Sequence, residues 1–354
     1  MGLNFANVSL TALRWALGYT FIFSGVVKSV DPVGTAIFVE KYLATYSLEA
    51  LLPLSLTIAI VLSVVEFALG CLITDRLFSR VVSTITLSLV SLFTIVTLLS
   101  ATVLPIGECG CFGNAIELTP WQTFFKNVVL LVMAFVVWRS ERGKEVKINY
   151  LSLIFAVAIP LIINIYALRH LPIIDFMPYD EGRNLREEVL KERAEERDAV
   201  RSMLKFRSVT TNEEQLFDST DSACWLNDDL EFVEAVTISE EVADLTYNDF
   251  HLYTSEGEDV TENLLQRSGR VVLLCINDGE ISGAQMRGIE QLRKCYGDEN
   301  IVILSASKVD AEWCRDIEQL SIDAMTLRSM MRADIGVVVL SDGVVEFKAN
   351  IRDL

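Results

Sequence analysis

This 354-residue chain is poor in histidine, cysteine and proline, with two, seven and seven of them respectively. Two histidines, with no His/Cys cluster at zinc-ligand spacing, argue against a structural zinc site, and we expect no bound metal. The scattered cysteines form no dense framework, which excludes a small disulfide-stapled fold. A Gly-rich nucleotide loop and a haem-attachment CxxCH motif are both absent from the sequence. Nucleotide and haem chemistry are therefore not indicated.

Charged residues are few in the first half of the chain, and acidic residues outnumber basic ones about two to one in the second. Residues 1–172 carry 11 Lys/Arg against 9 Asp/Glu, and residues 173–354 carry 19 against 39, which gives the net charge of −18. The mean hydropathy of +0.39 is too high for an ordinary soluble protein. The chain thus divides into an apolar half, whose partner is the lipid bilayer, and an acidic, water-soluble half. That acidity argues against nucleic acid, because its phosphates would be repelled.

Five apolar runs approach the roughly 20 residues that a membrane-spanning helix needs. In chain order they are Leu10–Val30, Leu51–Ile73, Val81–Leu104, Trp121–Trp138 and Tyr150–Leu168. Pro160 is expected to kink the fifth run. The mixed stretch from Pro32 to Leu48 indicates an interfacial or re-entrant helix. The first run could instead be a signal peptide, but it lacks a basic n-region and a small-residue cleavage site.

The orientation of these helices follows from where the basic residues lie. The loop after the second run has Arg76 and Arg80, and the loop after the fourth is also basic, with Arg139, Arg142, Lys144 and Lys147. Because basic loops stay in the cytoplasm, the N-terminus is predicted to be inside. The loop between the third and fourth runs, and the whole soluble half, are then predicted to be outside, in a compartment that permits disulfides.

The loop between the third and fourth runs contains the sequence Cys109-Gly110-Cys111-Phe112-Gly113. A bond between cysteines this close would be strained, and strained, exposed disulfides tend to be labile or catalytic. We interpret Cys109 and Cys111 as a redox pair, with a structural pair or two unlinked thiols as alternatives. Lys28 and Lys126 are predicted at the same membrane face, where they could lower a thiol pKa or simply extend to the interface.

Two ionisable residues lie inside predicted membrane helices. Glu66 is in the second run and Arg14 enters the first from the cytoplasmic side. Charged groups in membranes are costly and often functional. We expect Glu66 and Arg14 to pair, either as a structural link between helices or as part of a proton relay or quinone contact.

The second half is predicted to contain a linker and an α/β domain. Residues 1–140 form the transmembrane domain and residues 141–172 contain its fifth helix. Residues 173–248 are read as an acidic linker with an exposed helix over Gly182–Phe206, followed by little periodicity. In residues 249–354, strands and helices alternate. The expected elements are strands at Phe250–Tyr253, Arg270–Ile276 and Ile301–Ala306, helices at Ile281–Tyr296 and Val309–Leu320, and a hairpin over Gly336–Lys348.

The membrane half resembles the DoxX-like superfamily and, within it, the MauE (methylamine utilisation) proteins. The resemblance covers about residues 10–140 and is carried by Leu13-Arg14, Phe21–Lys28, Asp31-Pro32, Tyr42, Glu66, Gly70, the Cys109–Gly113 sequence, Trp121 and Lys126-Asn127. It implies a four-helix bundle in a bacterial cytoplasmic membrane, to which the fifth helix is added. MauE is implicated in maturing a disulfide-containing enzyme subunit, and other relatives in quinone-coupled thiol chemistry. The resemblance therefore implies a quinone as the cofactor, if there is one.

Residues 249–354 resemble a thioredoxin-like domain. Val271–Cys275 corresponds to the strand that precedes the family's CxxC motif, and Ile335–Gly343 to its cis-proline strand and hairpin. This chain has no CxxC after the first strand, and Ile335 occupies the place of the cis-proline. The resemblance thus implies a degenerate fold that serves for contact.

Three functional hypotheses follow. The first is extracytoplasmic thiol–disulfide exchange or redox-protein maturation through Cys109 and Cys111, with a thiol-bearing protein as partner. Under this hypothesis the chain is an oxidoreductase if Cys109 and Cys111 alternate between dithiol and disulfide forms. The second is a non-catalytic membrane scaffold that binds a partner through the thioredoxin-like domain. The third is a small-molecule carrier that depends on Glu66 and Arg14. Cys224 is a further candidate thiol, whereas Cys71, Cys275, Cys295 and Cys314 are expected to be packing residues.

Overall fold

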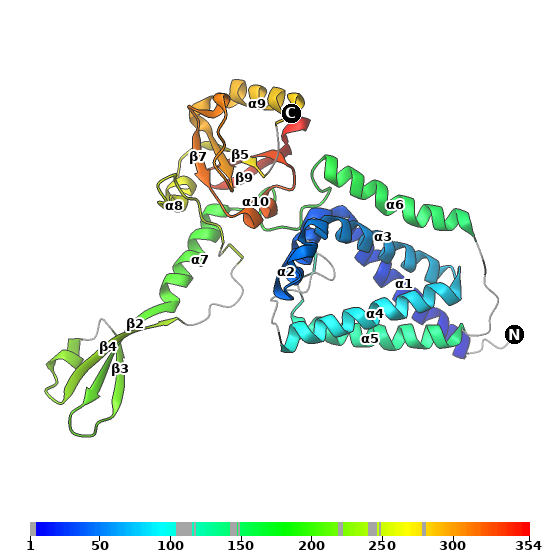
Figure 1. Cartoon of the computed structure of the whole chain (residues 1–354), viewed down its shortest axis with the longest axis horizontal. Helices are drawn as coiled ribbons and strands as arrows, with labels where there is room; N and C mark the ends of the chain where they lie inside the picture. The colour runs from blue at the N-terminus through cyan, green and yellow to red at the C-terminus, as the bar shows by residue number, and fades with distance from the viewer. Residues whose placement is uncertain are drawn as a thin grey trace.

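The protein consists of a helical membrane domain followed by mixed α/β structure with two sheets (Figure 1). The computed structural model describes residues 5–103, 115–116, 118–141, 147, 149–218, 222–239, 246–247, 249–277 and 281–354. Cys109 and Cys111 lie outside these residues. In the described part, five helices are long and apolar enough to cross a membrane, which confirms the predicted multi-pass architecture.

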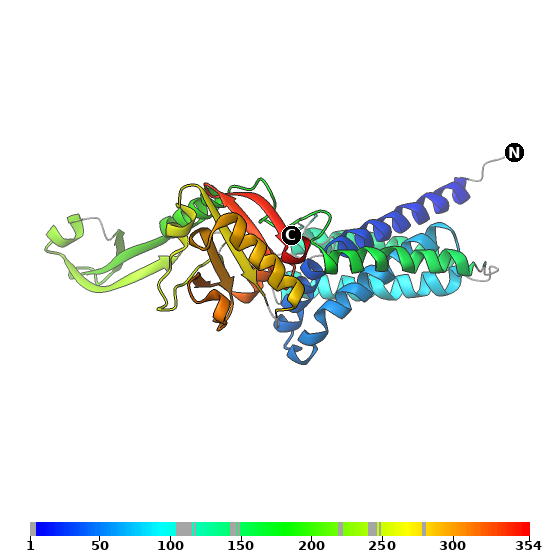
Figure 2. The ribbon, with the colours of Figure 1, turned by 90° about the horizontal axis from the view of Figure 1, so that it is seen from above.

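Within its described residues, the membrane domain has six α-helices and one short 3-10 helix. They are α1 (Phe5–Val30), α2 (Pro32–Thr45), η1 (Glu49–Leu54), α3 (Ser55–Thr74), α4 (Ser79–Thr102), α5 (Pro120–Ser140) and α6 (Tyr150–Arg169). The helices α1, α3, α4, α5 and α6 correspond to the five predicted spans, and η1 extends the second span at its start. The predicted interfacial segment is α2, a helix at the end of the bundle that faces the α/β domain (Figures 1 and 2).

Helices α1 and α3 pack closely because glycines face the contact. A Cβ added to Gly25 would come within 2.5 Å of the backbone nitrogen of Phe67, and one on Gly70 within 2.6 Å of the carbonyl oxygen of Gly18. Small residues at such positions let two membrane helices approach backbone to backbone. This close approach brings polar side chains of α1 and α3 within bonding distance of each other.

The α/β domain has a five-stranded sheet in the order β7-β6-β5-β8-β9. Its strands are β5 (Arg270–Ile276), β6 (Ile301–Ser305), β7 (Glu318–Ser321), β8 (Ile335–Ser341) and β9 (Val344–Asn350). β5, β6 and β7 are parallel, whereas β8 is antiparallel to both β5 and β9. The helices of this part are α8 (Thr261–Leu265), α9 (Gly283–Tyr296) and α10 (Ala324–Met330), with short 3-10 turns η3 (Asp298–Asn300), η4 (Glu312–Cys314) and η5 (Ile351–Asp353).

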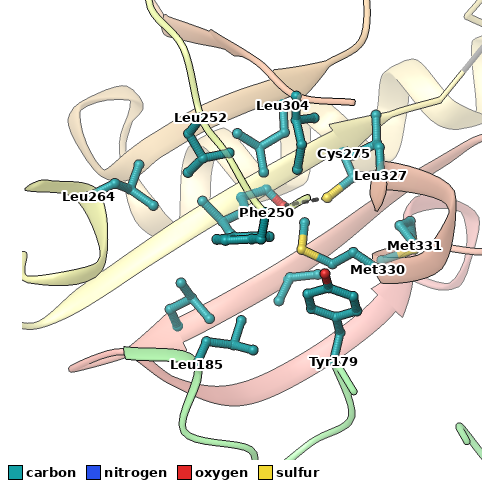
Figure 3. Close-up of a cluster of buried hydrophobic side chains, with 14 of the residues drawn as sticks. Tyr179, Leu185, Phe250, Leu252, Leu264, Cys275, Leu304, Leu327, Met330 and Met331 are labelled. Carbon is teal, nitrogen blue, oxygen red and sulfur yellow. Dashed lines mark hydrogen bonds between the residues drawn. The ribbon is translucent and has the colours of Figure 1, made fainter. Parts of the chain in front are cut away.

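Each face of this sheet has its own buried core. Figure 3 shows the core that includes Phe250, Cys275 and Leu327, into which Tyr179 also packs. The opposite face packs against α9 through Ile289 and Leu292. Strands buried on both faces read as continuous apolar runs, which is why β5 was predictable to the residue.

A separate β-arm extends away from the body of the protein (Figures 1 and 2). It begins with α7 (Leu185–Ala199) and continues into an antiparallel sheet of order β3-β2-β4. The strands are β2 (Val200–Ser208), β3 (Glu214–Asp218) and β4 (Leu230–Ser239), with η2 (Ser222–Leu226) between the last two. Phe206 is 1% exposed and packs against the rings of Phe217, Trp225 and Phe232.

The structure corrects several predicted elements. The exposed helix ends at Ala199 instead of Phe206, because β2 pairs with β3 and β4 in the stretch expected to lack periodicity. The helix expected over Val309–Leu320 is replaced by η4 and β7, since Leu320 pairs with Leu304 of β6. Tyr253 forms only isolated bridges, so no strand runs over Phe250–Tyr253.

Candidate functional site: an intramembrane cavity with a buried ion pair

The membrane domain contains a partly open cavity of about 260 Å³, lined by the first five α-helices. Its walls are largely apolar, and polar side chains gather along one part of them. The polar lining residues are Thr20, Ser24, Lys28, Thr35, Tyr42, Glu66, Thr97, Lys126 and Asn127. The apolar lining residues include Phe21, Phe38, Ile58, Leu62, Phe93 and Leu130. An apolar cavity with a few convergent polar groups is the usual form of a small-molecule site.

A buried ion pair joins α1 to α3 in the wall of this cavity. The Nζ of Lys28 lies 2.7 Å from Oε2 of Glu66 and donates a second hydrogen bond of 2.6 Å to Oγ of Ser24. The side chains of Lys28 and Glu66 are 4% and 2% exposed. Burying a charged side chain in a membrane costs free energy unless the charge is paired and hydrogen-bonded. The bond between Lys28 and Glu66 therefore stabilises both charged groups in the cavity wall.

Neutral polar groups continue the polar region on α4 and α5. Asn127 and Thr97 are buried, and the Nδ2 of Asn127 donates to Oγ1 of Thr97 at 3.3 Å. Lys126 also lines the cavity. The cavity therefore combines hydrogen-bonding groups and positive charge with an apolar body. Such a lining suits a mainly apolar ligand that carries a polar group.

The predicted pairing of Glu66 with Arg14 is wrong. Arg14 instead forms an ion pair with Glu141, the residue that caps α5, and donates a 3.1 Å hydrogen bond to Oγ of Ser140. Arg14 and Lys28 are separated by 14 residues of α1, which places them about 21 Å apart along the helix. Because α1 and α3 pack along their length, only Lys28 is at the level of Glu66.

The predicted redox pair lies outside the described residues, between two helices that line the cavity. α4 ends at Thr102 and α5 begins at Pro120. The last turns of α4 supply Thr97 and the first turns of α5 supply Lys126 and Asn127 to the cavity. The segment that carries Cys109 and Cys111 therefore joins two helix ends that line the cavity. Lys28 and Lys126, predicted near the thiols, both lie in the cavity wall.

The other cysteines differ in exposure. Cys275 is fully buried in β5, and burial raises the pKa of its thiol to about 12. Cys224 and Cys314 are buried too, whereas Cys71 is half-buried. Cys295 on α9 is exposed, which corrects its expected role as a packing residue. Among the residues that the structure describes, no group of three or more His, Cys, Asp or Glu is arranged to hold a metal ion.

The α/β domain contacts the cavity-lining helix α2 through charged residues that sequence reasoning missed. Arg328 of α10 forms an ion pair of 2.8 Å with Glu40 of α2. Arg332 lies 3.2 Å from Asp31, the N-cap of α2, and 2.7 Å from Asp175. Local sequence patterns do not predict the ion pairs of Arg328 with Glu40 and of Arg332 with Asp31, because these partners are about 300 residues apart in the chain.

Together the fold and the cavity define a multi-pass membrane protein whose helical domain has an amphiphilic cavity and carries an α/β domain at one end. Residues 6–139 match the family model for the methylamine utilisation protein MauE, which confirms the predicted resemblance over this region. A curated relative, Protein TlpB of Flavobacterium psychrophilum, is 29% identical over 170 residues, which is 44% of this chain and 43% of that protein. The chain thus spans less than half the length of this relative. No solved structure matches the chain.

Proposed function

We propose that the protein performs thiol–disulfide exchange at the outer membrane face, with Cys109 and Cys111 as the redox pair and a quinone in the cavity as electron acceptor. The observation that carries this proposal is the amphiphilic cavity itself. Its polar side is built partly by Lys126 and Asn127 and by Thr97, next to the helix ends that the cysteine segment connects. A quinone has the apolar ring and the polar oxygens that such a site suits.

The reaction balances without a further reagent. The Cys109 and Cys111 thiols lose two protons and two electrons as their S–S bond forms. A quinone bound in the cavity would accept these two electrons and two protons. A thiol-bearing partner protein then reduces the pair again by exchange, and its own two thiols become a disulfide.

The ion pair supports this role because a quinone oxygen gains negative charge as it is reduced. A preorganised ammonium group in a water-poor site stabilises such charge far better than water does. Lys28 and Lys126 supply positive charge to the cavity wall, and Glu66 is a carboxylate through which a proton can pass.

The distribution of charge between the two ends of the bundle supports an extracytoplasmic site. Arg14, Arg76 and Glu141 gather at the end where α3 leads to α4. Arg80 and Arg139 lie near this end as well, and its basic loops favour the cytoplasm. The cavity-lining helix α2 and the α/β domain are at the opposite end (Figure 1).

The α/β domain is proposed to be a degenerate thioredoxin-like module. Its order β6-β5-β8-β9, in which β8 alone runs antiparallel to the other strands, agrees with that resemblance. Because it lacks a CxxC motif, the second candidate function is a scaffold in which this domain binds a partner and the cysteine pair is dispensable.

The test is differential alkylation of the full-length protein in intact cells, with a membrane-impermeant thiol reagent before and after mild reduction. We expect Cys109 and Cys111 to be accessible and to change between oxidised and reduced forms, and exposed Cys295 to remain reduced as an internal control. A pair that is permanently reduced and inaccessible would refute both the orientation and the exchange reaction. In purified protein, a short-chain quinone analogue should oxidise the pair, and Cys109→Ser should abolish quinol formation.

A further inference from the structure

A compact cluster of four charged residues joins the α/β domain to the membrane domain. Arg332 bonds to both Asp31 and Asp175, and Nζ of Lys348 lies 2.5 Å from the other oxygen of Asp175. The side chains of Arg332 and Lys348 are 1% and 5% exposed. Two cations therefore face two carboxylates in a site that is nearly closed to water.

Asp31 has two separate roles in this cluster. Its Oδ1 accepts a 2.7 Å hydrogen bond from the backbone N–H of Gly34, which caps α2, while its Oδ2 accepts from Arg332. A second contact lies further along α2, where Glu40 accepts from Arg328 and from Oγ of Ser55 at the start of α3. The α/β domain thus contacts α2 near its first residue and again in its middle.

The same helix forms one wall of the cavity. Thr35, Phe38, Val39, Tyr42 and Leu43 all lie on α2 and line the cavity. The hydroxyl of Thr35 also donates a 3.0 Å hydrogen bond to the carbonyl oxygen of Asp31. The residue that binds Arg332 is therefore one turn of helix away from the first residue that would contact a ligand.

We propose that Arg332 is a positioning residue, through which the α/β domain holds α2 in place as a wall of the intramembrane cavity. This gives the α/β domain a role that requires no CxxC motif. Its effect on quinone turnover rests on the proposed function, whereas its effect on the position of α2 does not.

Arg332 can position α2 because the two positive and two negative charges of the cluster balance only when the two domains are in contact. Without Arg332, Asp175 keeps its bond to Lys348, but Asp31 loses the cation that it faces in a nearly dry interface, and removing one partner of a buried ion pair is strongly destabilising. The least costly response is for α2 to move toward water and hydrate Asp31. That movement opens the cavity at Val39 and leaves the opposite wall on α5 unchanged.

The test measures how fast single reporter thiols in the cavity wall react with N-ethylmaleimide, read at each position by mass spectrometry of the full-length protein. Val39→Cys reports on α2 and Leu130→Cys reports on α5, and both positions line the cavity. We expect Arg332→Gln to accelerate labelling of the α2 reporter by roughly tenfold or more and to leave the α5 reporter unchanged.

Two further variants separate the ion pair from other effects. Asp31→Asn retains a side-chain oxygen that can cap α2 but loses the charge that faces Arg332, so it should accelerate the α2 reporter as well. Arg267→Gln breaks an exposed ion pair with Glu318 in the same domain and should change neither reporter.

Equal acceleration of both reporters by Arg332→Gln would show a general loss of structure and would overturn the positioning role. No acceleration of either would overturn it too. Neither reporter depends on Cys109 or Cys111, so a failure of thiol exchange remains distinguishable from a failure of this inference.

Discussion

The buried pair of Lys28 and Glu66 allows the sharpest prediction, because its two members are bonded at 2.7 Å and almost completely removed from solvent. Glu66→Gln removes the carboxylate that bonds to the Lys28 ammonium, and Lys28→Met removes the ammonium that bonds to Glu66. Breaking a buried pair by removing one member costs about 3–5 kcal/mol, because the remaining charge stays buried. Each single variant is expected to lose about that much stability.

The double variant Lys28→Met/Glu66→Gln should lose much less than the sum of the two single changes. Replacing both charges by neutral groups of similar size removes the desolvation cost together with the attraction. The two single effects should therefore be non-additive by roughly 2–3 kcal/mol or more, as expected for residues in direct contact. Stability can be measured as the free energy of denaturant-induced unfolding in lipid nanodiscs, followed by tryptophan fluorescence.

The same variants separate structure from function. We expect the double variant to fold but to reduce a quinone analogue at least about tenfold more slowly, since charge stabilisation at the quinone oxygen is lost. Arg14→Met/Glu141→Gln is the matched control, because it removes a buried pair at the other end of the bundle. Additive single effects, or full quinone reduction by the first double variant, would refute the reasoning.

Three further predictions concern other parts of the chain. Gly25→Val should disrupt α1–α3 packing and lower the thermal midpoint in nanodiscs, because its Cβ would meet the Phe67 backbone; Gly283→Val, in open space, should not. Phe206→Ala should destabilise the β-arm by about 3–5 kcal/mol and expose its backbone amides to hydrogen exchange, whereas the body should keep its protection. Although burial raises the pKa of Asp175, the charges of Arg332 and Lys348 outweigh this and hold it below its ordinary value of 3.8. The stabilisation from ionised Asp175 is complete above about pH 4 and is lost as the pH falls through the lowered value. The thermal midpoint of Asp175→Asn should therefore depend less on pH below 4 than that of the parent, and equal dependence would contradict this account.

Local features of the sequence were sufficient for the elements that depend on composition. Long apolar runs predicted all five spans, because a bilayer requires a continuous apolar surface. Continuous apolar runs likewise predicted β5 with its observed bounds and all of β6 with one residue too many, since both strands are buried on both faces. The hairpin turn at Asp342 and Gly343 was also predictable from local sequence. Both residues have positive φ, and Asp-Gly is a sequence that favours such a turn.

Tertiary structure alone decided which distant residues meet. The sequence placed Glu66 and Arg14 in the membrane, but the close packing of α1 on α3 matched Glu66 with Lys28 instead. It gave no sign that Arg332 would bond to Asp31, or that β2 would pair with β3 and β4. Hydropathy and turn chemistry act over a few residues, so the sequence by itself determined the membrane spans and the buried strands. The energy of an ion pair or a strand pairing depends on groups brought together from far apart, so the cavity and the contact between the domains were decided only by the fold.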